Sequence, residues 1–226
     1  ESDFRKFKEF DNHKSVIKIE DKDANLRGFI AIHNDALGSP VVGGTRMLPY
    51  ESEEEALADV LKLSRAMTYK CAIAGVPHGG AKGVIIGDPQ KDKTEKLLKA
   101  YAKAINSLEG KFCTGEDVGI SQNDVNVMLK VSPYFIGKPG FAGDPSPYAA
   151  LSTFYAMESA AKSVLKKDSL KGMRVAIKGV GKVGKALVGL LSNAGATIFI
   201  SDIDPVALRE TKSKFPTVGA YDGRRG

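Results

Sequence analysis

The feature that most constrains this chain is a glycine-rich turn between a short apolar strand and an amphipathic helix. Residues 179–184 form a G-x-G-x-x-G pattern. Val175-Ala176-Ile177 read as a strand before it, and apolar residues recur at helical spacing over 182–194 after it. A strand, a tight turn and a helix in this order predict the start of a Rossmann-type sheet, which binds a dinucleotide.

Each glycine of this turn has a physical role in that prediction. Gly179 permits the turn, Gly181 lets a pyrophosphate approach the backbone, and Gly184 lets helix and strand pack closely. Asp202 stands 23 residues after Gly179, where a carboxylate would accept hydrogen bonds from ribose hydroxyls and repel a 2′-phosphate. We therefore expect NAD as the cofactor; the alternative is a plain βαβ turn with an N-capping Asp. The predicted cofactor-binding residues are Gly179, Gly181, Lys182, Val183, Gly184 and Asp202.

The periodicity of the remaining sequence predicts an α/β protein. We expect strands at 14–20, 27–34, 40–44, 84–86, 111–114, 174–177 and 197–200, and helices beginning near Ser52, Thr94, Ser121, Pro147, Lys182 and Pro205. Ser52 and Glu55 fit a capping box. A loop rich in Gly and Pro over 137–147 predicts the domain boundary, with Ser146 as the N-cap of a helix that reaches about Lys166. The expected domains are residues 1–145 and 146–226.

Composition narrows the class of protein. The net charge is +6, but the lysines are scattered, which is typical of a solvated surface and not of a nucleic-acid site. The two cysteines, Cys71 and Cys113, lack metal-ligand spacing and predict reduced thiols. The sequence shows neither a signal peptide nor an apolar stretch of the ~20 residues that span a bilayer. We expect a cytoplasmic protein without a bound metal, a nucleic-acid partner or a membrane partner.

Two lysines and an acid precede the glycine turn and suit one chemistry when taken together. Lys70 follows the first long helix, Lys82 lies on a glycine-flanked loop at the start of a strand, and Asp117 stands in a Glu-Asp-Val-Gly run. Taken singly, they read as solvated lysines and a loop cap. Beside a dinucleotide, one cation can hold the carboxylate of an amino acid, a partly desolvated lysine can act as a base, and a carboxylate can transfer protons. The alternative, an oxidoreductase acting on a hydroxy acid, needs no lysine pair.

Six motifs in order give the chain a family resemblance. They are Gly43-Gly44-Thr45-Arg46, Met67-Thr68-Tyr69-Lys70, Gly79-Gly80-Ala81-Lys82, Glu116-Asp117-Val118-Gly119, Gly143-Asp144-Pro145-Ser146-Pro147 and the glycine turn. Over almost its whole length the chain resembles the glutamate/leucine/phenylalanine/valine dehydrogenases, of the leucine/phenylalanine type. The resemblance implies that Lys82 and Asp117 are catalytic, that Lys70 binds the substrate carboxylate, and that Gly43, Gly44 and Met67 line the substrate site. It also implies a substrate domain at 1–145, an NAD domain at 146–226 and a homo-oligomer.

The sequence departs from the family pattern in two places. A Thr expected near the nicotinamide is replaced in the stretch Tyr148-Ala149-Ala150, and Ser152 or Thr153 are possible substitutes. The chain also ends after two predicted strands of the nucleotide sheet, so that domain is incomplete. We expect the sequence to be a fragment; a shortened relative is the alternative. The rival function is a non-catalytic nucleotide-binding or assembly module of the same family.

Two residues predict the substrate side chain. Glutamate-specific relatives carry a lysine directly before the Gly-Gly pair, whereas this chain has Val42 there. An unpaired carboxylate against an apolar wall is unfavourable, so we expect an apolar or aromatic amino acid and not glutamate. Gly115 stands where leucine-type relatives tend to carry Ala. The missing methyl group favours a larger side chain such as that of Phe or Trp over Leu or Val.

Overall fold

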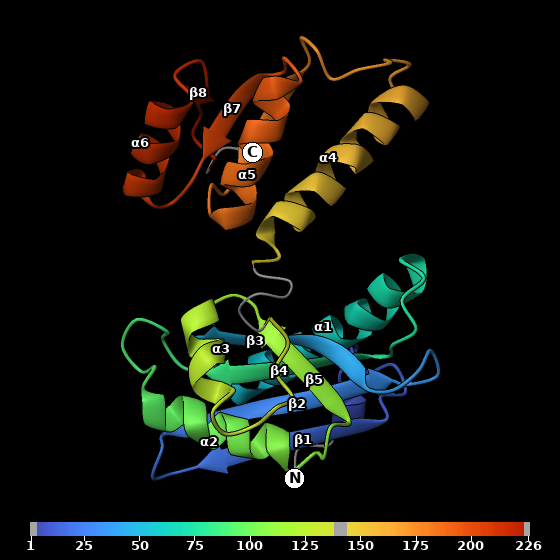
Figure 1. Ribbon diagram of the computed structural model, residues 1–226, viewed down its shortest axis with the longest axis vertical. Helices are drawn as coiled ribbons and strands as arrows, with labels where there is room; N and C mark the ends of the chain where they lie inside the picture. Colours follow the sequence, from blue (N-terminus) through green and yellow to red (C-terminus); the bar gives the residue numbers. More distant parts are fainter. Residues whose placement is uncertain (1–3, 138–143, 224–226) are drawn as a thin grey trace. The chain divides into compact units, whose positions relative to one another are not determined.

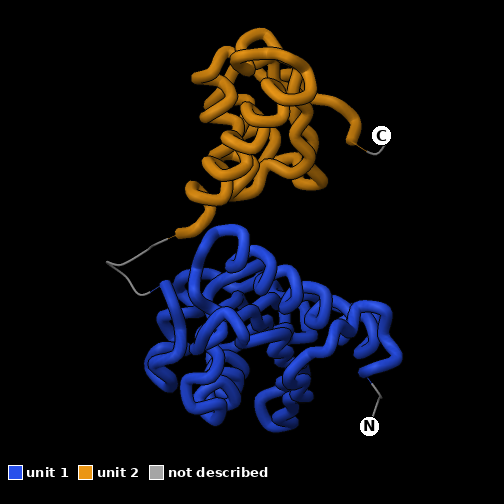
Figure 2. Tube along the Cα trace, turned by 90° about the vertical axis from the view of Figure 1, so that its right-hand side faces the viewer, with its two compact units in different colours: residues 1–143 blue, residues 144–226 orange. Residues whose placement is uncertain are grey.

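The computed structural model describes residues 4–137 and 144–223 of the chain. The chain forms two compact units, residues 1–143 and residues 144–226 (Figure 2). The division falls within the loop predicted at 137–147, two residues before the expected boundary. Residues 138–143 of that loop, including Gly143 of its motif, lie outside the described residues. No helix in the described ranges is long and apolar enough to cross a membrane.

The first unit is built on a five-stranded mixed sheet in the order β1-β2-β4-β3-β5 (Figure 1). The strands are β1 (Ser15–Asp21), β2 (Leu26–Asn34), β3 (Val41–Leu48), β4 (Gly80–Ile86) and β5 (Phe112–Glu116). β1 and β2 form the expected antiparallel hairpin, and β4 continues the antiparallel pairing from β2. β3 then pairs in parallel with both β4 and β5.

Helices cover both faces of this sheet. On one face α1 (Glu53–Ile73) packs through buried Leu57, Val60 and Leu61 against the side chain of Val84. On the other face α2 (Glu95–Asn106) and α3 (Gln122–Met128) bury an apolar cluster that includes Ile85. β4 is buried on both faces, and its last three residues, Val84-Ile85-Ile86, are accordingly apolar without alternation. The face under α1 carries the candidate site.

Three local predictions for this unit need correction: the start of β4, the position of Lys82 on a loop, and the capping box at Ser52. β4 begins at Gly80 and not at Val84, so Lys82 lies within the strand and not on a loop. The ladder to β3, with Thr45 opposite Gly83, extends the strand through glycines that carry no strand propensity of their own. The Ser52 hydroxyl accepts from the Glu55 N–H as expected, but the Glu55 carboxylate accepts from the Glu51 N–H, so the reciprocal half of the capping box is absent.

The second unit is built on a parallel sheet in the order β6-β7-β8. Its elements are α4 (Ser146–Ser163), β6 (Arg174–Lys178), α5 (Lys182–Asn193), β7 (Thr197–Ser201), α6 (Pro205–Lys214) and β8 (Gly219–Ala220). The prediction of only two strands is wrong, because β8 adds a two-residue strand that is held by its ladder to Phe199 and Ile200. α4 has Pro145 and not Ser146 as its N-cap. It also ends at Ser163 and not near Lys166.

Two buried histidines tie the N-terminal segment and β2 to α1. The Asp11 N–H donates to His13 Nδ1 at 3.1 Å, so the proton of the neutral ring is on Nε2, which donates to the Leu61 carbonyl at 2.9 Å. His33 Nδ1 lies 2.9 Å from the Thr68 hydroxyl, which also accepts the Gly80 N–H at 3.0 Å. These contacts hold the start of β4 against the C-terminal half of α1.

The environment of His13 predicts a pH-dependent stability. Burial lowers the pKa of His13 below its ordinary value of 6.5. The folded state therefore binds fewer protons than the unfolded state, so the contribution of this group is complete above 6.5 and is lost as the pH falls toward the lowered value. Between about pH 5 and about pH 7 we expect the Tm difference between wild type and His13→Gln to shrink as the pH falls. A difference that stays constant over that range would contradict the assignment.

Candidate active site

Lys82, which is buried, and Asp117, which is half-buried, form an ion pair on the α1 face of the first sheet. The Lys82 Nζ lies 2.6 Å from the Asp117 Oδ2, and their side chains are 8% and 24% exposed. Lys82 is held within β4, and Asp117 directly follows β5. The two residues predicted to be catalytic are therefore brought together although 35 positions separate them in the sequence.

A network that was not predicted surrounds this pair. The Arg46 Nε donates to the Asp117 Oδ2 at 3.0 Å, and the Arg46 Nη1 donates to the Asp59 Oδ2 at 3.1 Å. The Tyr50 hydroxyl donates to the same Asp59 oxygen at 2.7 Å. Arg46 belongs to the Gly-Gly-Thr-Arg motif, which was the available signal, but neither Asp59 nor Tyr50 stands in any of the motifs.

Opposing effects set the ionisation of the pair. Burial of the amine lowers the pKa of Lys82, and the charge of Arg46 adds to that effect, so that together they outweigh the attraction of Asp117. Burial alone would raise the pKa of Asp117, but the charge and hydrogen bond of Lys82 and the charge of Arg46 hold it below its usual range. The site therefore combines an ionised acid with an amine that loses its proton more readily than an exposed lysine.

Other predicted substrate-site residues lie on or beside this face. Gly44 belongs to it: a methyl group there would lie 3.3 Å from the Lys82 Nζ and 3.2 Å from the Asp117 Cβ. Val42 precedes Gly44 by two positions on β3, so it points to the same side and is half-buried. Gly43 alternates to the opposite side, so any substrate contact from Gly43 would come from its backbone.

The remaining predicted residues of the first unit lie on α1 and at the end of β5. Met67 is half-buried on α1, and Lys70 is exposed in its last turn. Among the described residues, the further cation in contact with the Lys82–Asp117 pair is Arg46. A methyl group at Gly115 would lie 2.9 Å from the Ile136 Cγ1, so Ile136 bounds the space that the missing methyl leaves. Sequence reasoning missed Ile136, which lies between the Glu116-Asp117-Val118-Gly119 motif and the Gly143-Asp144-Pro145-Ser146-Pro147 motif and is 48% exposed.

The glycine turn of the second unit has an open backbone. Gly179 has a φ of 94°, a conformation that favours glycine, and its N–H donates to the Ser201 carbonyl at 2.7 Å. A side chain at Gly181 would meet no atom within 4 Å, whereas one at Gly184 would overlap the Gly179 carbonyl oxygen. Gly181 is the N-cap of α5 and provides no side-chain cap, so the first N–H groups of the helix face the open turn.

Asp202, the predicted ribose ligand, already has hydrogen-bond partners within the second unit. The Asp202 Oδ2 accepts from the Val180 N–H at 2.6 Å, and its Oδ1 accepts from the Asp204 N–H at 2.9 Å. Asp202 thus stabilises the glycine turn. A hydrogen bond from a ribose hydroxyl to this carboxylate would be made in addition to these two bonds. The Thr153 hydroxyl donates to the Ala149 carbonyl at 2.8 Å, which uses its proton within α4, and Ser152 is exposed.

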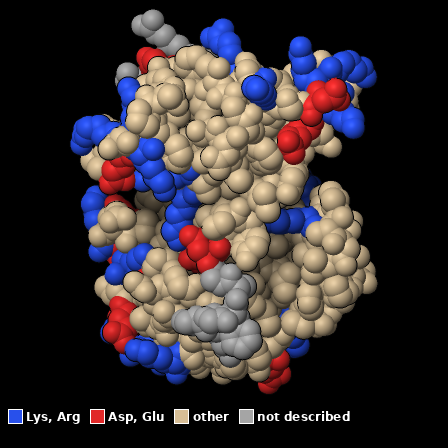
Figure 3. Space-filling view, turned by 45° about the horizontal axis from the view of Figure 1, so that its top comes forward, with Lys and Arg blue, Asp and Glu red and all other residues tan. Residues whose placement is uncertain are grey.

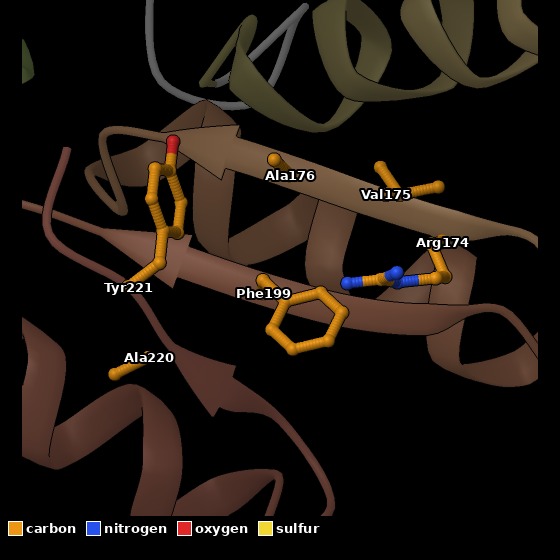
Figure 4. A pocket seen from close by; sticks show the side chains of 6 residues that line it. All are labelled: Arg174, Val175, Ala176, Phe199, Ala220 and Tyr221. Atoms are coloured by element: carbon orange, nitrogen blue, oxygen red, sulfur yellow. The ribbon is translucent and has the colours of Figure 1, made fainter. Parts of the chain in front are cut away.

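A hollow of about 500 Å³ lies on the sheet of the second unit (Figure 4). It is lined by Arg174, Val175, Ala176, Phe199, Ala220 and Tyr221. The guanidinium of Arg174 lies 5.3 Å from the centroid of the Phe199 ring. None of the lining residues belongs to the glycine turn, so the hollow is separate from the predicted cofactor residues. Basic and acidic side chains are interspersed on the face drawn in Figure 3, as on a solvated surface.

Comparison with known proteins assigns the family. Residues 13–134 match the model of the Glu/Leu/Phe/Val dehydrogenase dimerisation domain. The chain is 42% identical over 203 residues to L-tryptophan dehydrogenase from Nostoc punctiforme, an alignment that covers 90% of this chain and 57% of that relative. It is 44% identical over 206 residues to phenylalanine dehydrogenase from Thermoactinomyces intermedius, covering 90% of this chain and 56% of that relative. The chain therefore belongs to the Glu/Leu/Phe/Val dehydrogenase family and spans a little over half the length of these relatives.

Solved structures agree with this assignment. The crystal structure of L-tryptophan dehydrogenase from Nostoc punctiforme matches with a TM-score of 0.65 and 39% identity, covering 93% of this chain and 59% of that chain. The Leu-bound form of hetero-hexameric glutamate dehydrogenase from Thermus thermophilus matches with a TM-score of 0.73 and 22% identity, covering 90% and 56% respectively. The second likeness shows the fold alone. The predicted α/β fold class and the family resemblance are confirmed.

Two glycines of the turn provide a matched pair of substitutions. Gly181→Ala adds a methyl group in open space at a φ of −67°, so we expect stability to stay within about 1 kcal/mol of wild type. Gly184→Ala overlaps backbone and should destabilise the fold by about 1–3 kcal/mol. Chemical denaturation measures both, and calorimetric NAD titration should show weaker binding to Gly181→Ala than to wild type. Unchanged NAD affinity in Gly181→Ala would argue against phosphate binding at this turn.

Proposed function

We propose that the protein containing this chain is an NAD-dependent amino-acid dehydrogenase. It oxidatively and reversibly deaminates an apolar or aromatic L-amino acid to the 2-oxo acid and ammonia. The observation that carries the proposal is the 2.6 Å contact between the buried Lys82 amine and the half-buried Asp117 carboxylate, beside Gly44, where a methyl group would crowd both residues. Family membership supports the reaction class, since the matched relatives are named as tryptophan and phenylalanine dehydrogenases.

The glycine turn fits a dinucleotide. Open space at Gly181 and the uncapped start of α5 suit a pyrophosphate, which accepts hydrogen bonds from helix N-terminal amides. Asp202 stands directly after β7, where its negative charge disfavours a 2′-phosphate and so favours NAD over NADP. When bound, NAD supplies the oxidant that takes a hydride from the substrate Cα. Residues Gly179, Lys182, Val183 and Gly184 complete the proposed cofactor site.

The residues of the first unit divide the remaining chemistry among them. Lys70 holds the substrate carboxylate through its exposed ammonium group. Oxidation at Cα leaves an imine, which water must attack. The Lys82 amine, with its lowered pKa, accepts a proton from that water. Asp117 transfers protons between the substrate nitrogen and water, and its contact with the Lys82 amine allows the two groups to exchange a proton.

The family match also supports proposals about assembly. The matched family model describes a dimerisation domain, so we propose that the protein forms a homo-oligomer. We also propose that it acts in the cytoplasm. The alternative function is a nucleotide-binding or assembly module without catalysis. The two differ in one measurement, the formation of reduced nicotinamide when the full-length protein is mixed with NAD and a panel of amino acids.

Substitution of the pair tests the proposed roles. In the full-length protein we expect Lys82→Ala and Asp117→Asn each to abolish turnover while NAD still binds, because neither residue belongs to the glycine turn. Lys70→Ala should mainly raise KM. Steady-state kinetics and NAD titration separate these effects. If Lys82→Ala kept more than about a tenth of the wild-type kcat, a barrier change under ~1.4 kcal/mol, Lys82 would not be the base.

The substrate side chain is tested by kcat/KM for Phe, Trp, Leu, Val and Glu. Because Val42 cannot pair with a carboxylate, glutamate should be the poorest of these substrates. Large apolar or aromatic substrates should be preferred over Leu and Val. In Gly115→Ala the added methyl group presses on Ile136 and narrows that space, so the Phe-to-Leu ratio should fall about tenfold or more. An unchanged ratio would show that Gly115 does not set the pocket size.

A further inference from the structure

Arg46 connects two carboxylates, of which only one has a role in the proposed mechanism. Its Nε donates to Asp117, the proposed acid, and its Nη1 donates to Asp59, which has no assigned role. The Arg46 and Asp59 side chains are only 20% and 23% exposed. Partial burial strengthens both interactions, because water competes less for the charged groups.

Asp59, the second carboxylate that Arg46 contacts, is itself held in place. Asp59 stands on α1, and its Oδ2 accepts both the Arg46 guanidinium and the Tyr50 hydroxyl. Tyr50 comes from the segment between β3 and α1, so three separate parts of the chain hold one guanidinium in place. A planar guanidinium can donate from Nε and Nη1 to two carboxylates in a fixed geometry, which an ammonium group cannot reproduce.

We propose that Arg46 is a positioning residue, held by Asp59 and Tyr50, which fixes the Asp117 carboxylate against the Lys82 amine and places a second positive charge on the carboxylate oxygen that the amine contacts. The inference rests on the proposed function, because it assigns Lys82 the role of base. Arg46 and Lys82 both contact the same oxygen, Asp117 Oδ2. In a simple lysine–aspartate pair the carboxylate would hold the proton on the amine. A second cation on that oxygen weakens this hold.

The charged groups around the amine act in known directions. Arg46 from β3 lowers the pKa of Lys82, whereas Asp117 after β5 and Asp59 from α1 raise it. Burial of Tyr50 and its bond to Asp59 raise the pKa of its hydroxyl, so Tyr50 stays neutral and acts as a donor. Removal of the Arg46 charge therefore raises the pKa of Lys82. The limb of the pH profile that rises as Lys82 loses its proton should move to higher pH.

The experiment compares Arg46→Gln, which removes the charge, with Arg46→Lys, which keeps the charge but cannot donate to Asp117 and Asp59 in the planar geometry of a guanidinium. In the full-length protein, the rising limb of kcat/KM for amino-acid oxidation should move to higher pH in Arg46→Gln and stay near its wild-type position in Arg46→Lys. Both variants should lose about tenfold to 100-fold in kcat, the scale expected for a misplaced catalytic group. Tyr50→Phe changes no charge and should lower kcat by less, without moving the limb. Arg27→Gln, at an exposed arginine of β2, is the matched control and should behave as wild type.

A second readout needs no turnover. The titration of the Lys82 Cε signal by NMR, assigned with Lys82→Arg, should shift to higher pH in Arg46→Gln and not in Arg46→Lys or Arg27→Gln. Identical Lys82 titrations in wild type and a folded Arg46→Gln would overturn the inference. If wild type oxidised no amino acid, the proposed function would fail on its own, and the NMR titration would still decide whether Arg46 controls the amine. Circular dichroism verifies that each variant is folded.

Discussion

The parallel pairing of β3, β4 and β5 is the constraint on which the first unit's site depends. In this register Thr45 lies opposite both Gly83 and Glu116. Side chains alternate across a strand, so the neighbouring rows place Gly44 and Lys82 on the α1 face and bring Arg46 beside Asp117. A shift of one residue would turn Lys82 toward the apolar core under α2. The chemistry of the site is thus a consequence of the whole ladder, whose register is fixed by the apolar residues on both of its faces.

The site also shows how a fold accommodates charges that it removes from water. An isolated buried ammonium group is costly, and one carboxylate partner compensates only part of that cost. Here two cations and two carboxylates alternate, from Lys82 through Asp117 and Arg46 to Asp59, with the Tyr50 hydroxyl at the end. The arrangement satisfies the charges and still leaves the pKa of Lys82 below its ordinary value. The contacts that compensate the buried charges are therefore the same ones that influence the pKa of Lys82.

Glycines serve both units, for different physical reasons. Gly44 is buried, and a methyl group there would crowd the Lys82 Nζ and the Asp117 Cβ, whereas Gly115 leaves space that Ile136 then bounds. In the second unit Gly184 is needed because a side chain would overlap backbone, whereas a side chain at Gly181 would project into open space. A motif records that glycine is present at these positions. Only the surrounding atoms show whether it is there for packing, for access or for a backbone conformation.

The sequence by itself determined the elements whose signals are local. The hairpin of β1 and β2, the caps at Ser52 and Ser121, the helix that begins near Thr94, and the strand, turn and helix around residues 179–184 follow from periodicity and capping chemistry over a few residues. The ordered motifs also indicated Lys82 and Asp117, because these residues stand in motifs whose order and approximate spacing resemble those of the family. Tertiary structure alone decided what depends on distant partners. Hydrogen bonding to β3 extends β4 toward the N-terminus as far as Gly80, and packing of α1 on the sheet places Asp59 next to Arg46. Such contacts join residues that are distant in the sequence and follow no helical or strand periodicity. They contribute to stability only after the sheet has formed, so no local sequence pattern indicates them.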